Sequence, residues 1–442
     1  MLRKNWKTAA FTIAGLGLMT PAQGDQVTDM QAQIDALRTE LSQVQVQQGD
    51  NWLNERRAEE VKGLIMEVLS DADTRASLMN DGAIAGHNGE HFFIHSADGA
   101  FALYVSGQLQ FQYIYNNQDV STATDEDEGG FQLRRGKINF DGHISSPKVG
   151  YHVSLARDWF DSGNGVILEE YNVSHQINDN LNVAAGLMLI PFQAEDLIDS
   201  TRLLAVERTP TNEFFTPNRA EGVRLTYGDG PLTITGMISD GADSERTDFE
   251  DDSSEIALTG RIDYIIEGEA SQGEDFTGWS GEGQYLRVGG AYHLEYGDAR
   301  NGGTADYHAH TIDAHYENGA FNLFGAYTGA TIDPDGGGSD RDMDGFVLQG
   351  GVHVVPDKVE IFGQWFFIDG DVAGEDDFDG FVIGMNYYIN GHRTKFTADV
   401  IVLNEDAPTG NPFGDVIATS RLGLISGTED EMAVRTSIQV LF

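Results

Sequence analysis

Few side chains in this chain have the types and spacing that catalysis or tight metal binding would need. His308 and His310 are alternate residues of one expected strand and could reach a shared ion, but the sequence places no third ligand beside them. Serine and histidine both occur, yet no G-x-S-x-G or comparable nucleophile motif is present. We therefore expect no catalytic residue, no metal centre and no cofactor, and we interpret the two histidines as ordinary strand residues.

One acidic segment partly matches a calcium-binding loop. Asp340, Asp342, Asp344 and Gly345 follow the pattern D-x-D-x-D-G, but the position that requires a bidentate Glu is occupied by Gly351. We interpret the segment as a solvated acidic loop, with a surface divalent cation as the alternative.

Composition excludes several classes of protein. The formal net charge is -44, so a nucleic-acid partner is not expected, because phosphate backbones are bound by clustered Lys and Arg. Disorder is not expected either, since 40% of the 442 residues are hydrophobic and 10% are aromatic. There is no cysteine, which excludes disulfides and thiolate sites.

The N-terminal residues have the pattern of a secretory signal peptide. Arg3, Lys4 and Lys7 precede a mostly apolar run over residues 9–19, and small residues then flank a predicted cleavage point at the end of residues 1–24. No other part of the sequence has 18 consecutive apolar residues, so we expect export without a transmembrane helix.

Residues 25–80 are expected to be helical, followed by a linker over residues 81–100. Apolar residues at spacings of three and four form a short heptad pattern, which predicts a coiled coil. It could be the stalk of an oligomer, a tether to peptidoglycan, or a single amphipathic helix at the mouth of the domain that follows. The heptad residues are Val27, Met30, Ile34, Leu37, Leu41 and Val44.

From residue 101 the apolar pattern changes to a period of two, which predicts strands. Most of the segments are long enough for a tilted strand to cross a bilayer. We expect sixteen strands, near 101–116, 130–145, 148–160, 165–177, 180–190, 219–228, 231–240, 255–267, 284–296, 305–317, 319–330, 344–354, 358–369, 379–390, 393–404 and 430–442.

The connections between these strands are of two kinds. Tight turns alternate with long segments, and short turns on one side with long loops on the other are typical of an outer-membrane β-barrel. We place all the long segments on the outer side: 117–129, 191–218, 241–254, 269–283, 331–343 and 405–429.

The last strand shows how lipid and water would each meet one face. Val434, Ile438 and Val440 alternate with polar residues such as Arg435 and end at Phe442. A terminal Phe after an alternating strand resembles the C-terminal signal by which outer-membrane barrels are assembled. The fold class is thus an all-β transmembrane antiparallel barrel with an N-terminal helical segment.

Three segments resemble the phosphate-selective porin O and P family: residues 101–111, FALYVSGQLQF; residues 131–137, FQLRRGK; and the stretch from Gly186 to Val223. The resemblance implies a sixteen-stranded barrel in the outer membrane, a homotrimer, and a long third loop folded into the lumen as a constriction. Here that loop is expected to be residues 191–218.

Charged residues at expected lumen positions are the candidate pore residues. Family members that select phosphate use a ladder of Arg and Lys, whereas the constriction loop here also carries acids, which makes a mixed eyelet. The arginines could screen permeating anions, or they could pair with acids to hold the loop against the wall. We expect Arg134 to face away from the pore. The candidates are Arg135, Lys137, Arg224, Arg261 and Arg287 on the wall, Arg202, Arg208 and Arg219 in or beside the loop, and the acids Glu195, Asp196, Asp199, Glu207 and Glu213.

The sequence therefore predicts a porin, through which small hydrophilic solutes and ions diffuse passively. Two alternatives are a channel selective for phosphate or polyphosphate and a structural barrel that tethers the envelope. The large negative charge leads us to expect cation preference at the mouth.

Overall fold

The computed structural model describes residues 82–89, 91–118, 127–157, 165–242, 244, 254–298, 305–334, 338–372, 374–408 and 421–442. The expected signal peptide, residues 1–24, and the expected coiled coil, residues 25–80, lie outside these residues. In the described ranges, no helix is long and apolar enough to cross a membrane.

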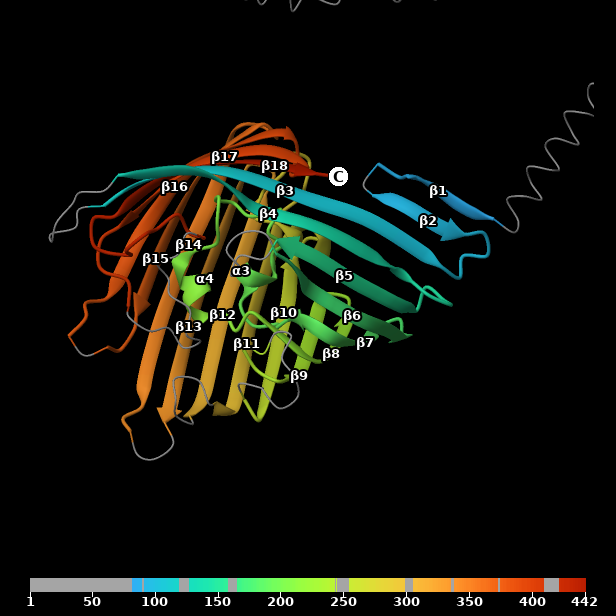
Figure 1. Cartoon of the computed structure of the whole chain (residues 1–442), viewed down its shortest axis with the longest axis horizontal. Helices are drawn as coiled ribbons and strands as arrows, with labels where there is room; N and C mark the ends of the chain where they lie inside the picture. The colour runs from blue at the N-terminus through green and yellow to red at the C-terminus, as the bar shows by residue number, and fades with distance from the viewer. Residues whose placement is uncertain are drawn as a thin grey trace, which may run out of the picture. The chain divides into compact units, whose positions relative to one another are not determined.

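Sixteen strands, β3 to β18, form one closed antiparallel sheet. Each pairs with its neighbours in sequence, and β18 pairs back with β3, which closes the barrel (Figure 1). The predicted sixteen-stranded barrel is confirmed. The strands are β3 (Ala102–Asn117), β4 (Glu128–His143), β5 (Val149–Arg157), β6 (Val166–Asn178), β7 (Leu181–Leu189), β8 (Arg219–Asp229), β9 (Leu232–Ser239), β10 (Ile256–Glu267), β11 (Tyr285–Asp298), β12 (Ala305–Asn318), β13 (Phe321–Pro334), β14 (Arg341–Val355), β15 (Val359–Asp369), β16 (Phe378–Asn390), β17 (Thr394–Leu403) and β18 (Met432–Leu441).

The two faces of the wall differ in the way that the alternation predicts. On β3, the side chains of Gln108, Gln110 and Gln112 are buried inside the barrel, whereas Leu109 and Phe111 are exposed on its outer surface. Successive side chains of a strand point to opposite faces, so an apolar outer face meets lipid while a polar inner face meets the lumen.

The C-terminal residue completes the closure of the barrel. The Gly107 amide donates to the Phe442 carbonyl oxygen at 2.7 Å, and the Phe442 amide donates to the Gly107 carbonyl oxygen at 3.0 Å. The Phe442 ring lies so close that a Cβ on residue 107 would be 2.3 Å from it, which explains why a glycine stands there.

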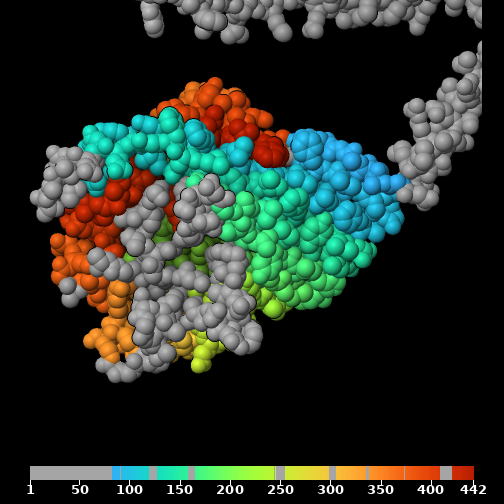
Figure 2. All heavy atoms as spheres, viewed as in Figure 1, coloured from blue at the N-terminus to red at the C-terminus, as the bar shows by residue number. Residues whose placement is uncertain are grey.

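The expected linker over residues 81–100 is wrong in part, because it contains two further strands. β1 (Ala83–His87) and β2 (Phe92–Ser96) form a hairpin, and β2 pairs with β3 from Phe92–Val105 to His95–Ala102. That part of β3 extends beyond the end of β18, which leaves its edge free for β2. In Figure 2 this hairpin (blue) continues the surface of the strands that follow it.

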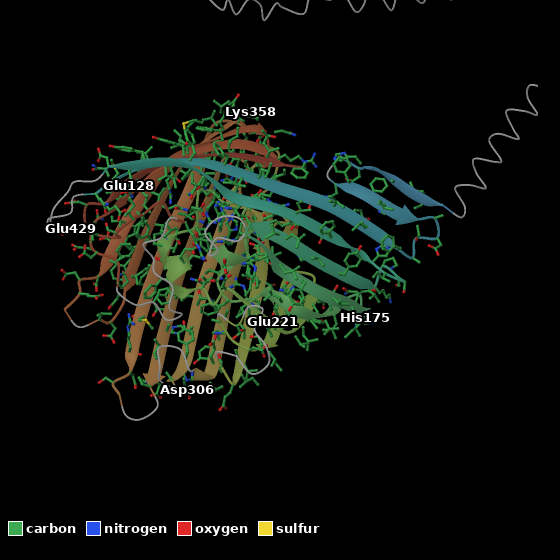
Figure 3. All side chains as sticks on the ribbon, viewed as in Figure 1. Glu128, His175, Glu221, Asp306, Lys358 and Glu429 are labelled. Carbon is green, nitrogen blue, oxygen red and sulfur yellow. The ribbon has the colours of Figure 1, made fainter. Side chains whose placement is uncertain are left out.

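The barrel has a long-loop end and a tight-turn end. Glu128, Asp306 and Glu429 lie at the long-loop end, and Lys358 and His175 lie toward the tight-turn end (Figure 3). One expected placement is wrong. Residues 268–284 connect β10 to β11, and β10 runs toward the tight-turn end, so this long connection belongs there and not on the outer side. It includes the 3-10 helix η2 (Ala270–Glu274).

Candidate pore site

The connection between β7 and β8, residues 190–218, lies inside the barrel, and we call it the lumen loop. Its two short helices are α3 (Ala194–Leu197) and α4 (Pro210–Phe215) (Figure 1). The helix α4 begins after Thr209, whose side chain accepts a hydrogen bond from the Asn212 amide, and has Pro210 at its first position. Apolar side chains, including those of Phe192 and Phe214, are fully buried in this loop. Their burial holds the loop within the barrel.

Hydrogen bonds from the barrel wall fix the lumen loop along its length. Most involve a side chain of the wall and the backbone of the loop, so they depend little on the loop's own side chains. They join Gln110 Nε2 to the Ser200 oxygen (3.0 Å), Gln439 Nε2 to the Thr201 oxygen (2.9 Å), Lys395 Nζ to the Leu203 oxygen (2.7 Å), Asn386 Nδ2 to the Leu204 oxygen (2.8 Å) and the Val206 amide to Asp399 Oδ2 (2.9 Å).

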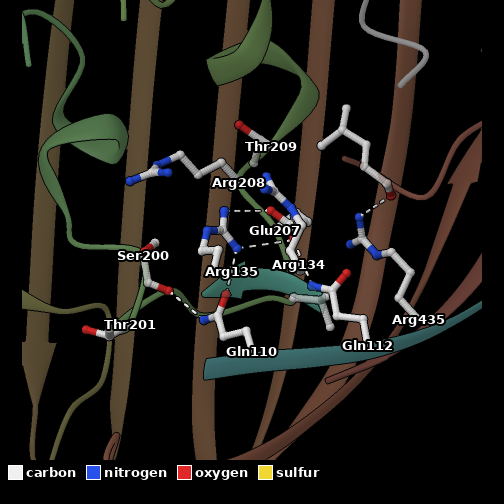
Figure 4. A network of polar contacts seen from close by, with 12 residues as sticks. Gln110, Gln112, Arg134, Arg135, Ser200, Thr201, Glu207, Arg208, Thr209 and Arg435 are labelled. Atoms are coloured by element: carbon white, nitrogen blue, oxygen red, sulfur yellow. Dashed lines mark hydrogen bonds and ion pairs between the residues drawn. The ribbon is translucent and has the colours of Figure 1, made fainter. Parts of the chain in front are cut away.

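Arg134 and Arg135 both face the lumen and both bind Glu207 of the loop (Figure 4). Arg134 Nε lies 2.9 Å from Glu207 Oε1, and Arg135 Nη2 lies 2.8 Å from Glu207 Oε2. Gln112 Nε2 donates to the same carboxylate at 2.8 Å. Burial alone would raise the pKa of Glu207, but the two guanidinium groups lower it to about 2, so the carboxylate is ionised.

The expectation that Arg134 faces away from the pore is wrong. The pairing of β3 with β4 shifts by one residue here, since Gln110 pairs with Arg135 and Phe111 with Leu133. Arg134 is the extra residue of this β-bulge, and a bulge can bring two successive side chains to one face.

Three other candidates, Glu195, Asp196 and Arg208, stabilise the lumen loop internally. Arg208 Nη2 donates to the carbonyl oxygens of Asp196 (3.0 Å) and Ile198 (2.7 Å), and Arg208 Nε lies 3.4 Å from Asp196 Oδ1. The Glu195 carboxylate accepts from the Thr209 amide and hydroxyl at 2.8 and 2.7 Å. Burial raises the pKa of Glu195 to about 7 although these hydrogen bonds oppose the shift.

Arg261 and Arg287 share two carboxylates on the opposite part of the wall. Arg261 Nη2 lies 2.9 Å from Asp313 Oδ2, and Arg287 Nη2 lies 2.9 Å from Asp313 Oδ1, while both guanidinium groups also bind Asp263. Arg261 donates as well to the Phe192 carbonyl oxygen at 2.9 Å and is 2% exposed. Arg261 is thus an anchor for the start of the lumen loop.

The remaining wall candidates, Lys137, Arg219 and Arg224, lie closer to open lumen. Lys137 Nζ pairs with Glu169 Oε2 at 2.6 Å, and Arg219 Nε pairs with Glu170 Oε1 at 2.8 Å. Arg224 is half-buried on the inner face of β8 and has neither a hydrogen bond nor an ion pair with any residue that the structure describes. Arg202 of the lumen loop pairs with Glu274.

A cavity of about 1590 Å³ lies within the barrel, and the described part of its lining has more cations than acids. Among the residues that the structure describes, eleven Arg and Lys line it against eight Asp and Glu, in a chain whose net charge is -44. The cations are Arg134, Arg135, Lys137, Arg157, Arg202, Arg208, Arg219, Arg224, Arg287, Arg393 and Arg421. The acids are Glu169, Glu170, Asp196, Asp199, Glu213, Glu274, Asp275 and Glu282.

The histidine pair and the acidic segment that were considered as metal sites do not form one among the described residues. His308 and His310 lie on the outer face of β12, alternating with the buried Tyr307 and Ala309. Asp342 accepts from the Thr331 hydroxyl at 2.7 Å. Among the residues that the structure describes, no three His, Asp or Glu side chains are arranged to hold a metal ion.

A closed sixteen-stranded barrel with an apolar outer face, a polar lumen and an inward loop defines the class of outer-membrane diffusion porins. The family model for phosphate-selective porin O and P matches residues 105–424, and the chain belongs to that family. It is therefore an outer-membrane channel protein and not an enzyme, as the sequence predicts.

Solved porin structures share the fold at low sequence identity. The anion-selective porin from Comamonas acidovorans is 17% identical, with a TM-score of 0.54 over 77% of this chain and 100% of that one. A loop L8 deletion mutant of OmpT from Vibrio cholerae is 11% identical, with a TM-score of 0.53 over 78% and 100%. The trimer form of OmpT is 10% identical, with a TM-score of 0.51 over 78% and 100%. No curated protein sequence matches the chain.

Proposed function

We propose that this porin prefers small hydrophilic anions, and that the lumen loop is the constriction at which they are selected. The observation that carries the proposal is the excess of Arg and Lys over Asp and Glu among the described residues that line the lumen cavity, against the large negative charge of the whole chain. Charges that line a narrow pore act at close range, whereas exposed charges beyond a Debye length are screened by salt.

The cations of β4 and β8 offer a stepwise path. Lys137 and Arg219 each pair with a carboxylate, and these partners, Glu169 and Glu170, are adjacent residues of β6. A permeating anion can share these cations without leaving a carboxylate wholly unpaired, and Arg224 has its donors free among the described residues. Weak sharing of this kind suits fast passage, since conduction requires that each site also release the ion.

Phosphate selectivity is the second candidate, favoured by the description of the family. The paired guanidinium groups of Arg134 and Arg135 have the geometry to bind an oxyanion, but the carboxylate of Glu207 already lies between them. This occupancy argues for a general preference for anions over strong retention of phosphate.

Phosphate block separates these two candidates. The full-length protein is inserted into planar bilayers and chloride current is recorded while inorganic phosphate is added. A general anion channel keeps most of its chloride current at millimolar phosphate, because Arg134 and Arg135 already bind Glu207. Saturable block at micromolar to millimolar phosphate would favour the phosphate-selective candidate.

We also propose a homotrimer, because a structural relative of this fold is described in a trimer form. The heptad segment would be its stalk, or a tether to peptidoglycan as the sequence suggests. The full chain is compared with a variant without residues 25–80, by native electrophoresis for the stalk and by co-sedimentation with peptidoglycan for the tether. A trimer that dissociates in the deletion variant supports the stalk, and loss of co-sedimentation with peptidoglycan supports the tether.

A further inference from the structure

The connection between β10 and β11, residues 268–284, reaches into the barrel from the tight-turn end. Phe276 is 1% exposed and stacks edge-on with His315 at a ring distance of 5.2 Å. A Cβ on residue 278 would be 2.2 Å from the Asn318 carbonyl oxygen, so Gly278 allows the backbone to lie against the β12–β13 turn. We call residues 268–284 the inner-turn loop.

The inner-turn loop is fixed by polar contacts as well as by burial. Asp275 Oδ2 lies 3.0 Å from His392 Nε2 and accepts from Trp279 Nε1 at 3.1 Å. The Ser280 amide donates to Asp357 Oδ1 at 2.7 Å. These contacts attach the loop to two neighbouring turns, β14–β15 and β16–β17, so its position does not depend on the lumen loop.

The lumen loop is attached to the wall beside Arg202, and this attachment does not involve the inner-turn loop. Ser200 and Thr201 give their carbonyl oxygens to Gln110 and Gln439 on the wall, and the Arg202 amide donates to the Asp199 oxygen at 2.9 Å. Two loops that enter from opposite ends of the barrel are therefore each anchored to the wall, and Arg202 of one ion-pairs with Glu274 of the other.

This ion pair is open to the lumen. The side chains are 39% and 59% exposed, and both residues line the central cavity. Neither side chain is needed to fill a core, so the pair is separable from the packing of the two loops.

We propose that the Arg202–Glu274 pair is the size-limiting element of the channel, a cross-link that divides the lumen between the two loops and excludes larger solutes. It deepens the proposed function by assigning the size limit of the same lumen, but it does not depend on the preference for anions. Uncharged solutes meet this limit as anions do, because the barrier is steric.

Liposome swelling with uncharged sugars tests this inference without interference from charge. The full-length protein is reconstituted, and the swelling rate in a trisaccharide is divided by the rate in a pentose. In Glu274→Gln and in Arg202→Gln this ratio rises by up to about fivefold. An exposed ion pair changes the ratio of its closed to its open form by no more than about that factor. The charge-swapped double variant, Arg202→Glu with Glu274→Arg, returns the ratio toward that of the wild type.

Glu282→Gln is the matched control, because it removes the same charge from the same loop. Glu282 lines the cavity but has no ion-pair partner among the described residues, so the trisaccharide ratio stays at the wild-type value. Unchanged ratios in both single variants would overturn the inference, as would a charge swap that fails to restore the limit or an equal rise in Glu282→Gln. A channel without anion preference in which the ratios still change would contradict the proposed function and leave this inference standing.

Discussion

Arg135 and Glu207 form a bidentate ion pair inside the barrel, with Nη2–Oε2 and Nη1–Oε1 distances of 2.8 and 3.2 Å. The pair joins β4 of the wall to the lumen loop, and Arg134 binds the same carboxylate from the adjacent position of the bulge. A carboxylate held in this way occupies the place that a permeating oxyanion would otherwise take. Glu207 therefore links the attachment of the loop to the selectivity of the pore.

Replacing Glu207 by Gln should increase anion preference. The amide keeps the shape of the side chain but leaves two guanidinium groups without their counter-charge. One unit charge at about 6 Å in water changes an ion's local concentration by roughly threefold, so the anion-to-cation permeability ratio should rise by about that factor. Reversal potentials in a salt gradient measure it.

Glu195→Gln is the control for this substitution. At a pH above about 7, where the Glu195 carboxyl is ionised, it neutralises another buried carboxylate of the lumen loop, one that binds Thr209 and no guanidinium group. Its permeability ratio should stay near the wild-type value. Equal ratios in Glu207→Gln and the wild type would mean that the arginine pair does not act on permeating ions.

Arg224→Gln should reduce anion preference without loss of stability. The side chain lines the cavity and pairs with no described residue, so its removal leaves no carboxylate unpaired. The expected fall in the permeability ratio is again roughly threefold. Lys148→Gln, which removes an exposed cation outside the cavity lining, should have little effect. An equal effect of both substitutions would point to overall charge and not to the lumen.

Arg435→Gln should destabilise the barrel. Arg435 Nε lies 2.7 Å from Asp399 Oδ1, and both side chains are fully buried. Removing one partner of a buried ion pair costs about 3–5 kcal/mol. The free energy of unfolding in guanidinium, measured in vesicles, should fall accordingly, and adding Asp399→Asn should recover part of the loss. A single variant as stable as the wild type would show that Asp399 does not need this partner.

The attachment of the lumen loop near Glu195 should weaken as the pH rises. Burial raises the pKa of this carboxyl from 4.5 to about 7, so between these values it is protonated in the attached loop but would ionise in a released one. The released loop binds fewer protons, and protection therefore falls by up to about tenfold per pH unit in this window. Hydrogen exchange of the Thr209 amide, corrected for its intrinsic rate, measures this change. In Glu195→Gln the protection should be independent of pH, and a pH-independent wild type would contradict the account.

The strands could be predicted because every strand of the wall separates lipid from water. Neighbouring residues therefore alternate between apolar and polar, as Phe111 on the outer face and Gln112 on the inner face do. Arg134 could not be placed, because a bulge appears only when β4 is aligned with β3. The carboxylates that partner the arginines, such as Asp313 and Asp399, were missed for a related reason. To predict which residues face each other across two strands, the register must be known to within one residue. The strand ends predicted from a single sequence are not that precise.

Length alone predicts an outer position for the inner-turn loop, and that prediction is wrong because this long connection lies at the tight-turn end. Counting strands was the available signal, since β10 is the eighth strand of the barrel and must end where the other tight turns lie. The hairpin β1–β2 gave little signal, because each strand has only five residues.

The reversal potential of the wild-type channel across a potassium chloride gradient tests the central claim most directly. We expect chloride to be preferred over potassium, because cations outnumber acids among the described residues that line the lumen, although the chain as a whole is strongly acidic. A potential of the opposite sign, with potassium preferred, would contradict it and would show that the acidic outer segments set the selectivity.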